Sequence, residues 1–232
     1  DHRDLHRVDR RQRQMCIRDR CNPDPQEAKQ RKQLARQLKR VNGMLTPMSK
    51  YYCSEMCCRV AHDAIQVLGG SGYMKDYAAE RYLRDARITT IYEGTSQLQI
   101  VAAVRGVASG AFESYVADLE KTDYSDPLLH RLCQQLLDSK QRVLEAIQFV
   151  KGKSTAYLDL AGRRLVDAAI VVIAGHLLLR QGAVDERKKR VARRFIDSQL
   201  PALRMNIEQV LAGDMSPLEE YDLLAGPVPS GD

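Results

Sequence analysis

The chain has 232 residues, of which 36 are Lys or Arg, 30 are Asp or Glu, and only 6% are aromatic. With no tryptophan and many leucine, alanine, arginine and glutamine residues, this composition favours helices. Residues 1–40 contain 13 basic and 6 acidic residues, whereas the rest of the chain contains 23 and 24. Because the excess positive charge lies at one end, the composition argues against a nucleic-acid-binding body.

Neither a metal site nor a membrane span is predicted. The six cysteines form no CxxC pair and the five histidines lack zinc spacing, so we expect a reducing compartment and no structural metal. The most apolar run, residues 165–179, contains Asp167 and His176 and is too short and too interrupted to cross a membrane. It suits the middle of a helical bundle, with His176 as a satisfied core or boundary histidine.

The N-terminal part of the chain divides into an irregular segment and two helical patterns. Residues 1–25 are expected to be disordered or artefactual, because the first twenty have no apolar periodicity and no apolar segment typical of a signal peptide. Helices are predicted over residues 26–42, ending near Gly43, and over 47–68, with Pro47 near the start. The GGSG run that follows at residues 69–72 predicts a sharp reversal.

A short turn or helix is predicted over residues 77–85, and a brief extended stretch from Ile88 to Tyr92. A further helix is expected to start at Thr95 or Ser96, where Ser96 and Gln99 have the spacing of a capping box.

The remainder reads as four more helices and a flexible tail at residues 225–232. The predicted helices are residues 111–121, 127–151, 154–181 and 185–212. The basic run at 187–194 is interpreted as a solvated helix face in preference to a phosphate-binding stripe. The predicted fold is all-α, an up-and-down helical bundle followed by a further helical extension.

Three ordered motifs carry a more specific signal. They are Gln-x-x-Gly-Gly (Gln66, Gly69, Gly70), Glu-Arg-x-x-Arg-Asp (Glu80, Arg81, Arg84, Asp85) and Tyr-Glu-Gly-Thr-Ser-Gln (residues 92–97). In this order and spacing they resemble the C-terminal helical domain of the acyl-CoA dehydrogenases. These FAD-dependent enzymes introduce an α,β double bond into acyl-CoA thioesters.

The resemblance also suggests a domain plan. Residues 26–110 would be part of the C-terminal helical domain, and residues 111–224 resemble the extension of larger, very-long-chain-like members of the family. The family's N-terminal helical domain and central β-domain have no counterpart in this sequence. The chain therefore resembles a fragment, which we expect to be inactive alone.

The resemblance implies roles for individual residues. Glu93 would be the catalytic base that removes the α-proton while the β-hydride passes to FAD. Its backbone N–H would help to stabilise the enolate. The implied FAD contacts are Gln66, Gly69, Gly70, Thr95, Ser96 and Gln97, and the implied substrate contacts are Tyr92 and Gly94. The charged residues of the second motif are expected to form structural ion pairs at helical spacing.

The resemblance further implies acyl-CoA as substrate and an electron-transferring flavoprotein as electron acceptor. A homodimer or homotetramer is expected, because in the family the Gln66–Gly70 turn reaches the FAD of a neighbouring subunit. The expected location is the bacterial cytoplasm, or the mitochondrial matrix in a eukaryote. Two alternatives remain open: a non-catalytic helical oligomerisation or docking module that retains the motif, and a nucleic-acid binder that uses residues 1–40 and 187–194.

Overall fold

The computed structural model of the protein describes residues 25–226, without the side chain of Pro25. The expectations for residues 1–24 and 227–232 lie outside the described residues. The chain divides into two compact units, Asp1–Arg40 and Val41–Asp232.

The described part of the first unit is the beginning of helix α2 (Pro25–Leu68), up to Arg40. Its side chains are mostly exposed, including Leu34 and Leu38. Glu27 and Arg31 pair one turn apart, with 3.8 Å between Oε2 and Nη2. Exposed pairs of this kind contribute little, so this part of the helix depends mainly on residues of high helix propensity.

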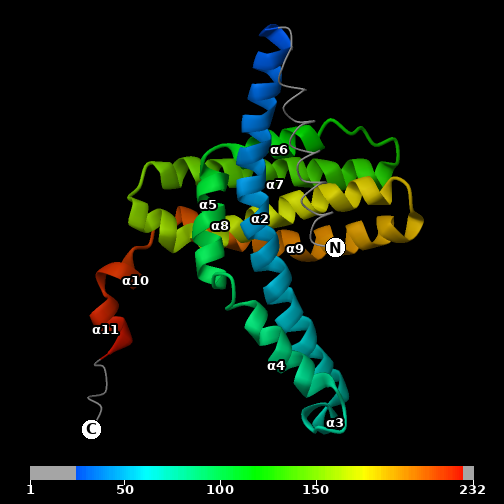
Figure 1. Ribbon diagram of the computed structural model, residues 1–232, viewed down its shortest axis with the longest axis vertical. Coiled ribbons are helices and arrows are strands. Elements are labelled where there is room, and N and C mark those ends of the chain that lie inside the picture. Colours follow the sequence, from blue (N-terminus) through cyan, green and yellow to red (C-terminus); the bar gives the residue numbers. More distant parts are fainter. Residues whose placement is uncertain (1–24, 227–232) are drawn as a thin grey trace, which may run out of the picture. The chain divides into compact units, whose positions relative to one another are not determined.

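The second unit contains the rest of α2 and every other described helix (Figure 1). Three long helices lie side by side, and shorter helices connect them to α2. The elements that follow α2 are α3 (Gly70–Tyr73), α4 (Ala79–Thr89), α5 (Ser96–Ala108), α6 (Ala111–Leu119), α7 (Pro127–Lys151), α8 (Thr155–Gly182), α9 (Glu186–Leu211), α10 (Ser216–Glu219) and α11 (Tyr221–Ala225). The all-α prediction is confirmed for the described residues.

The three long helices begin where the sequence predicts them, because each has a capping side chain. Asp126 Oδ1 accepts the backbone N–H groups of Leu128 and Leu129 at the start of α7. The side chains of Ser154 and Asp185 cap α8 and α9 in the same way. Lys189 Nζ donates to Asp126 Oδ2 at 2.8 Å, which ties the first turn of α9 to the cap of α7.

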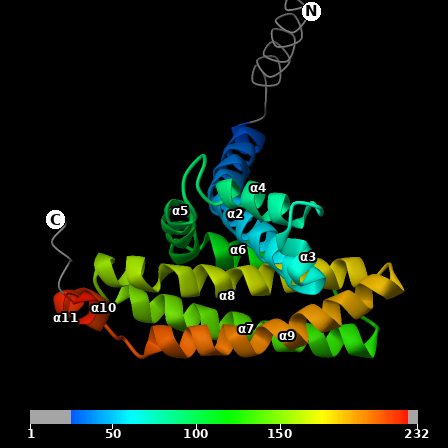
Figure 2. The ribbon, with the colours of Figure 1, turned by 90° about the horizontal axis from the view of Figure 1, so that it is seen from below.

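Helix α8 forms the centre of this unit. It packs against α7 and α9 on one side and against α5 and α6 on the other (Figure 2). Its buried side chains include Leu165, Val166, Val172 and Leu179. By length and composition it is the one described helix that could cross a membrane, but 67% of its most apolar window is buried inside the protein. Burial against neighbouring helices therefore accounts for its apolarity.

The predicted break between two N-terminal helices is wrong, because α2 continues through Gly43 and Pro47. A proline inside a helix costs about 3 kcal/mol, since it lacks an N–H and its ring presses on the carbonyl four residues earlier. Here that carbonyl belongs to Gly43, whose backbone is unusually free to adjust. The adjacent turns bury Met44 and Met48. Each buried side chain of this size contributes about 1.5–3 kcal/mol, so packing outweighs the cost of the proline.

The predicted extended stretch at residues 88–92 is also wrong. Ile88 and Thr89 complete α4, and a turn follows. The two threonine hydroxyl groups explain the difference, because they satisfy carbonyl groups at the helix end. Thr89 Oγ1 donates to the carbonyl of Ala86, and Thr90 Oγ1 donates to that of Arg87. The reversal after Leu68 is confirmed, with Gly69 at a φ of 60°.

The close approach of α5 to α2 makes a prediction about two glycines. A Cβ on Gly106 would lie 2.7 Å from Met44 Cβ, whereas a Cβ on Gly43 would have nothing within 4 Å. We expect Gly106→Ala to lower the free energy of unfolding by about 1–3 kcal/mol through overpacking. Gly43→Ala should raise it by up to about 1 kcal/mol through helix propensity. Denaturant titration of the two variants measures both changes, and equal stability would contradict the close packing.

His176 on α8 is a core histidine, as predicted, but the expected partners are absent. Its side chain is 1% exposed, and within the described residues neither ring nitrogen has a hydrogen-bond partner. Burial lowers the pKa of His176 to about 4, and the positive charges of Lys140 and Arg180 act in the same direction, against the carboxylate of Glu120.

This burial predicts that acid destabilises the fold. The unfolded chain binds a proton at His176 near pH 6.5, but the folded chain binds it only near pH 4. The neutral histidine therefore favours folding above that range, and stability falls as the pH drops from about 6.5 to 4, by on the order of 3 kcal/mol. His176→Leu should reduce the loss of stability between about pH 7 and 4.5, measured by urea unfolding. His130→Gln, at an exposed position, should leave the loss unchanged. If His176→Leu loses as much stability as the wild type, His176 is not the acid-sensitive group.

Candidate active site

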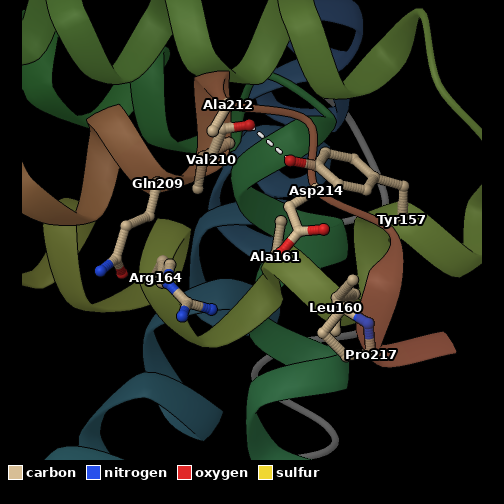
Figure 3. Close-up of a pocket in the computed structure, with 9 residues that line it drawn as sticks. All are labelled: Tyr157, Leu160, Ala161, Arg164, Gln209, Val210, Ala212, Asp214 and Pro217. Atoms are coloured by element: carbon tan, nitrogen blue, oxygen red, sulfur yellow. Dashed lines mark hydrogen bonds between the residues drawn. The ribbon is translucent and has the colours of Figure 1, made fainter. Parts of the chain in front are cut away.

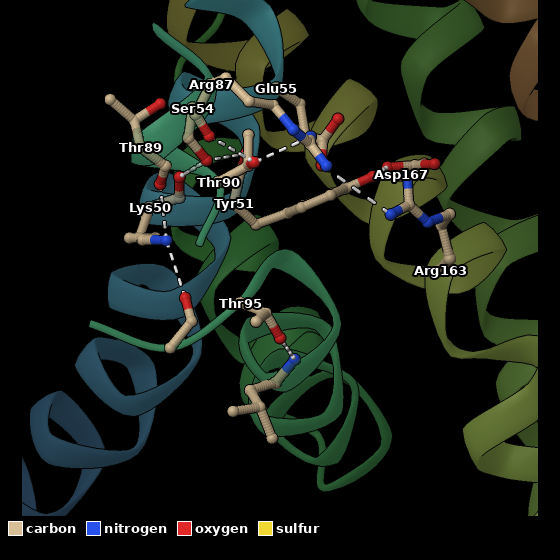
Figure 4. Close-up of polar contacts among 12 residues, drawn as sticks. Lys50, Tyr51, Ser54, Glu55, Arg87, Thr89, Thr90, Thr95, Arg163 and Asp167 are labelled. Carbon is tan, nitrogen blue, oxygen red and sulfur yellow. Dashed lines mark hydrogen bonds and ion pairs between the residues drawn. The ribbon is translucent and has the colours of Figure 1, made fainter. Parts of the chain in front are cut away.

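The Glu93 motif lies in the turn between α4 and α5. Figure 4 labels Thr90 and Thr95, which precede and follow Glu93 in the chain. The turn is closed at its base, because the backbone N–H of Ser96 donates to the carbonyl of Thr90 at 3.0 Å. Arg87 Nη1 donates to Thr90 Oγ1 at 3.0 Å and steadies the end of α4. Residues 91–95 form the short loop that lies between Thr90 and Ser96.

Glu93 has a strained backbone. Its φ is 52°, and it is the one described residue other than glycine with a positive φ. This left-handed conformation costs a residue with a Cβ about 1–2 kcal/mol. Glu93 is exposed to solvent. The next residue, Gly94, also has a positive φ, of 97°. Strain of this kind persists only where surrounding bonds enforce it, and it is concentrated at functional sites.

Two side chains hold the backbone on the C-terminal side of Glu93. Gln99 Nε2 donates to the carbonyl of Glu93 at 3.0 Å, and Lys50 Nζ donates to that of Gly94 at 2.8 Å. The same ammonium group lies 5.4 Å from the centre of the Tyr92 ring. The predicted capping box of Ser96 and Gln99 is therefore wrong, because Gln99 bonds to the loop and Thr95 caps the helix.

The backbone donors of this loop remain available to a ligand. Within the described residues, the N–H groups of Glu93, Gly94 and Thr95 form no hydrogen bonds. Ser96 is 7% exposed, and its Oγ has no partner among the described residues. These groups lie at the start of the 13-residue helix α5, where unpaired N–H groups and the helix dipole favour oxygen and anionic ligands.

The predicted cofactor residues fall into two separate groups. Gln66, Gly69 and Gly70 are exposed at the end of α2 and the start of α3, whereas Thr95, Ser96 and Gln97 lie at the start of α5. Helix α4 separates the two groups along the chain, and its 11 residues are about 16 Å long. The described residues thus bring Tyr92 to Gln97 together, but not the Gln66–Gly70 turn with them.

The charged motif on α4 forms surface contacts. Glu80 Oε1 and Arg84 Nη2 lie 3.9 Å apart, one helical turn from each other. Arg81 lies over the ring of Tyr82, 6.0 Å from its centre. The Glu80–Arg84 pair has the i, i+4 spacing expected of a structural ion pair.

Three hollows in the second unit lie away from Glu93. The largest, about 570 Å³, lies between α2, α3 and α4 and includes Cys58 and Arg84. The second, about 220 Å³, is apolar and lies between α2, α6 and α8. The third, about 240 Å³, lies between α8 and the end of α9 and includes Arg164 and Asp214 (Figure 3). None includes residues 92–97, so the described residues present Glu93 on an open surface.

Sequence reasoning missed Lys50. It lies 44 residues before Gly94, on a helix with no motif at that position, and no local pattern predicts that its side chain reaches the loop. The positive φ of Glu93 could not be predicted from the sequence either, because Glu-Gly is compatible with several turn types.

The helical fold and the strained Glu93 turn define a helical domain that presents a carboxylate beside the start of a helix. Comparisons with known proteins show which family this domain is similar to. The family described as "Acyl-CoA dehydrogenase, C-terminal domain" matches residues 28–108. Over these residues, about a third of the chain, the protein is similar to the C-terminal domain of the acyl-CoA dehydrogenases.

Individual relatives match a shorter part of the chain. A probable acyl-CoA dehydrogenase of Mycobacterium leprae is 45% identical over 65 residues, which are 28% of this chain and 17% of the relative. The CarC subunit of the caffeyl-CoA reductase–Etf complex of Acetobacterium woodii is 54% identical over 52 residues, which are 22% of this chain and 14% of the relative. The chain thus spans less than a fifth of the length of these relatives.

The fold has a counterpart among solved structures. An acyl-CoA dehydrogenase from Bacillus anthracis, in complex with FAD, matches with a TM-score of 0.54 and 19% sequence identity. The match covers 80% of this chain and 36% of that protein. At this identity the likeness concerns the fold alone.

The strain at Glu93 makes a prediction about stability. Glu93→Gly should raise the free energy of unfolding by up to about 1 kcal/mol, because glycine adopts the left-handed region without steric cost. Glu93→Val should lower it, since a β-branched residue is least tolerated there. Glu113→Gly, at an exposed position in α6, should instead cost about 1 kcal/mol. Denaturant titration distinguishes these outcomes, and destabilisation by Glu93→Gly would argue against backbone strain.

Proposed function

We propose that the chain supplies the catalytic base of an FAD-dependent acyl-CoA dehydrogenase, and that Glu93 is this base. The observation that carries the proposal is the left-handed Glu93, whose own backbone N–H is unpaired among the described residues. A carboxylate and a free N–H on the same residue can act on neighbouring atoms of one substrate. A simple surface turn would need neither the strain nor the unpaired donor.

The proposed chemistry divides between the side chain and the backbone of Glu93. The carboxylate removes the proton from the carbon next to the thioester carbonyl. The Glu93 N–H donates to the carbonyl oxygen and stabilises the negative charge that develops there. Gly94 has no side chain to obstruct the substrate, and Tyr92 would form one wall of the acyl site.

The start of α5 would hold FAD, which accepts the β-hydride when it is bound. The unpaired Ser96 Oγ and the N–H of Thr95 fit the hydroxyl and phosphate oxygens of this cofactor, and Gln97 lies exposed in the same turn. The solved relative with FAD supports the choice of cofactor. These residues would hold the polar part of FAD, since the described hollows do not enclose a flavin ring beside them.

The partners follow from the same site. Acyl-CoA thioesters are the proposed substrates, and an electron-transferring flavoprotein is the proposed electron acceptor. The relative CarC, named as a subunit of a complex with Etf, supports the acceptor. The Gln66–Gly70 turn, separated from Thr95–Gln97 by α4, would contact the FAD of another subunit, which supports a homodimer or homotetramer.

The function is tested by Glu93→Gln in a complete, FAD-loaded acyl-CoA dehydrogenase that contains this chain. Glutamine preserves the shape of the side chain but cannot take the proton, so we expect kcat to fall by at least about 100-fold, with flavin still bound. Dehydrogenation of acyl-CoA is followed by the loss of flavin absorbance. Glu113→Gln, which removes an exposed carboxylate on α6, should keep the wild-type rate. Near-normal activity of Glu93→Gln would assign the base to another residue.

A further inference from the structure

Lys50 bonds to both ends of the Glu93 loop. It lies on α2, and its Nζ donates to the carbonyl of Thr89 and to the carbonyl of Gly94, each at 2.8 Å (Figure 4). Thr89 is the last residue of α4, and Gly94 directly follows Glu93. One ammonium group thus connects the two carbonyls between which residues 90–93 form the turn.

The first contact is favourable for an electrostatic reason. The last carbonyl groups of a helix have no partners within that helix and carry the negative end of its dipole. The ammonium of Lys50 is a compact cation with three donors, so it can satisfy the carbonyl of Thr89 and still bond elsewhere. Its side chain is half-buried, which weakens the competition from water.

The second contact fixes the strained part of the loop. Lys50 holds the carbonyl of Gly94, and Gln99 holds that of Glu93, so the orientations of two successive peptide groups are determined. Both carbonyls are then occupied by protein donors, while the N–H of Glu93 stays unpaired within the described residues. The loop is thereby held with the carbonyl groups of Glu93 and Gly94 bonded to the protein and with the N–H of Glu93 available to a ligand.

The turn of α2 that carries Lys50 is itself anchored to α8. The next residue, Tyr51, is buried, and its hydroxyl donates to Asp167 Oδ1 at 2.9 Å. Arg163 Nη1 donates to the Tyr51 hydroxyl at 3.2 Å. In Figure 4 Tyr51 points towards α8 while Lys50 points towards the loop. Neighbouring residues of one helix therefore connect α8 to the Glu93 turn.

We propose that Lys50 is a positioning residue for the Glu93 loop. Its ammonium group holds residues 90–94 in the conformation that orients the carboxylate and the free N–H of Glu93. The role for catalysis rests on the proposed function, whereas the effect on the loop does not. Removing the ammonium should loosen the loop and leave the chemical nature of Glu93 unchanged.

Hydrogen exchange of the full 232-residue chain, followed by mass spectrometry, tests the effect on the loop. In Lys50→Met, the hydrogen-bonded amides of residues 90–92 and of Ser96 should exchange about tenfold faster than in the wild type, while those of α7 and α9 remain unchanged. Lys50→Arg, which retains the charge and several donors, should restore part of the protection. Lys151→Met, at an exposed position at the end of α7, is the matched control and should exchange as the wild type does. Unchanged exchange at the amides of residues 90–92 and Ser96, or equally faster exchange throughout the chain, would overturn the proposal.

A double-mutant cycle in a complete, FAD-loaded enzyme that contains this chain tests whether the effect acts through Glu93. Lys50→Met should lower kcat about tenfold or more, with KM and flavin content within about twofold of the wild type. In a Glu93→Gln background it should have no further effect on the residual rate. A full additional loss in that background would show that Lys50 acts independently and would overturn the positioning role. If Glu93→Gln alone has no effect on turnover, the proposed function fails, and the exchange experiment still decides the role of Lys50 in the loop.

Discussion

The burial of α8 is the constraint on which the rest of the second unit depends. This helix is almost wholly apolar along its middle, and α5, α6, α7 and α9 surround it. At about 25 cal/mol per Å² of apolar surface removed from water, such a helix supplies much of the free energy that orders its neighbours. The polar groups on α8, among them Asp167 and Arg163, therefore have fixed positions that other elements can use.

One such use connects the core to the Glu93 turn. Burial raises the pKa of Asp167, while its bond from Tyr51 and the nearby Arg163 oppose that change. A half-satisfied buried carboxylate would be costly, so the hydroxyl of Tyr51 serves both the stability of the core and the position of α2. Residues of α8 thus affect the position of the helix turn that carries Lys50. Through Lys50 they can influence the candidate site without contacting it.

Local signals predicted much of this fold, and their failures have specific causes. The caps Asp126, Ser154 and Asp185 mark the starts of α7, α8 and α9, because capping depends on residues close in sequence. Gly43 and Pro47 misled the prediction, since tertiary burial of Met44 and Met48 outweighs a local helix-breaking tendency. The motif around Glu93 was recognisable from its residues. Its strain and its bond to Lys50 were not, because they depend on contacts between segments about 40 residues apart in sequence.

The position of α8 in the chain has a consequence during synthesis. Translation proceeds from the N-terminus, so α8 leaves the ribosome before α9, which covers one side of it in the folded protein. Until α9 has been made, the face of α8 that α9 covers remains exposed, on a helix that is long and apolar enough to resemble a membrane segment. A chain truncated within α9 would keep that apolar face exposed.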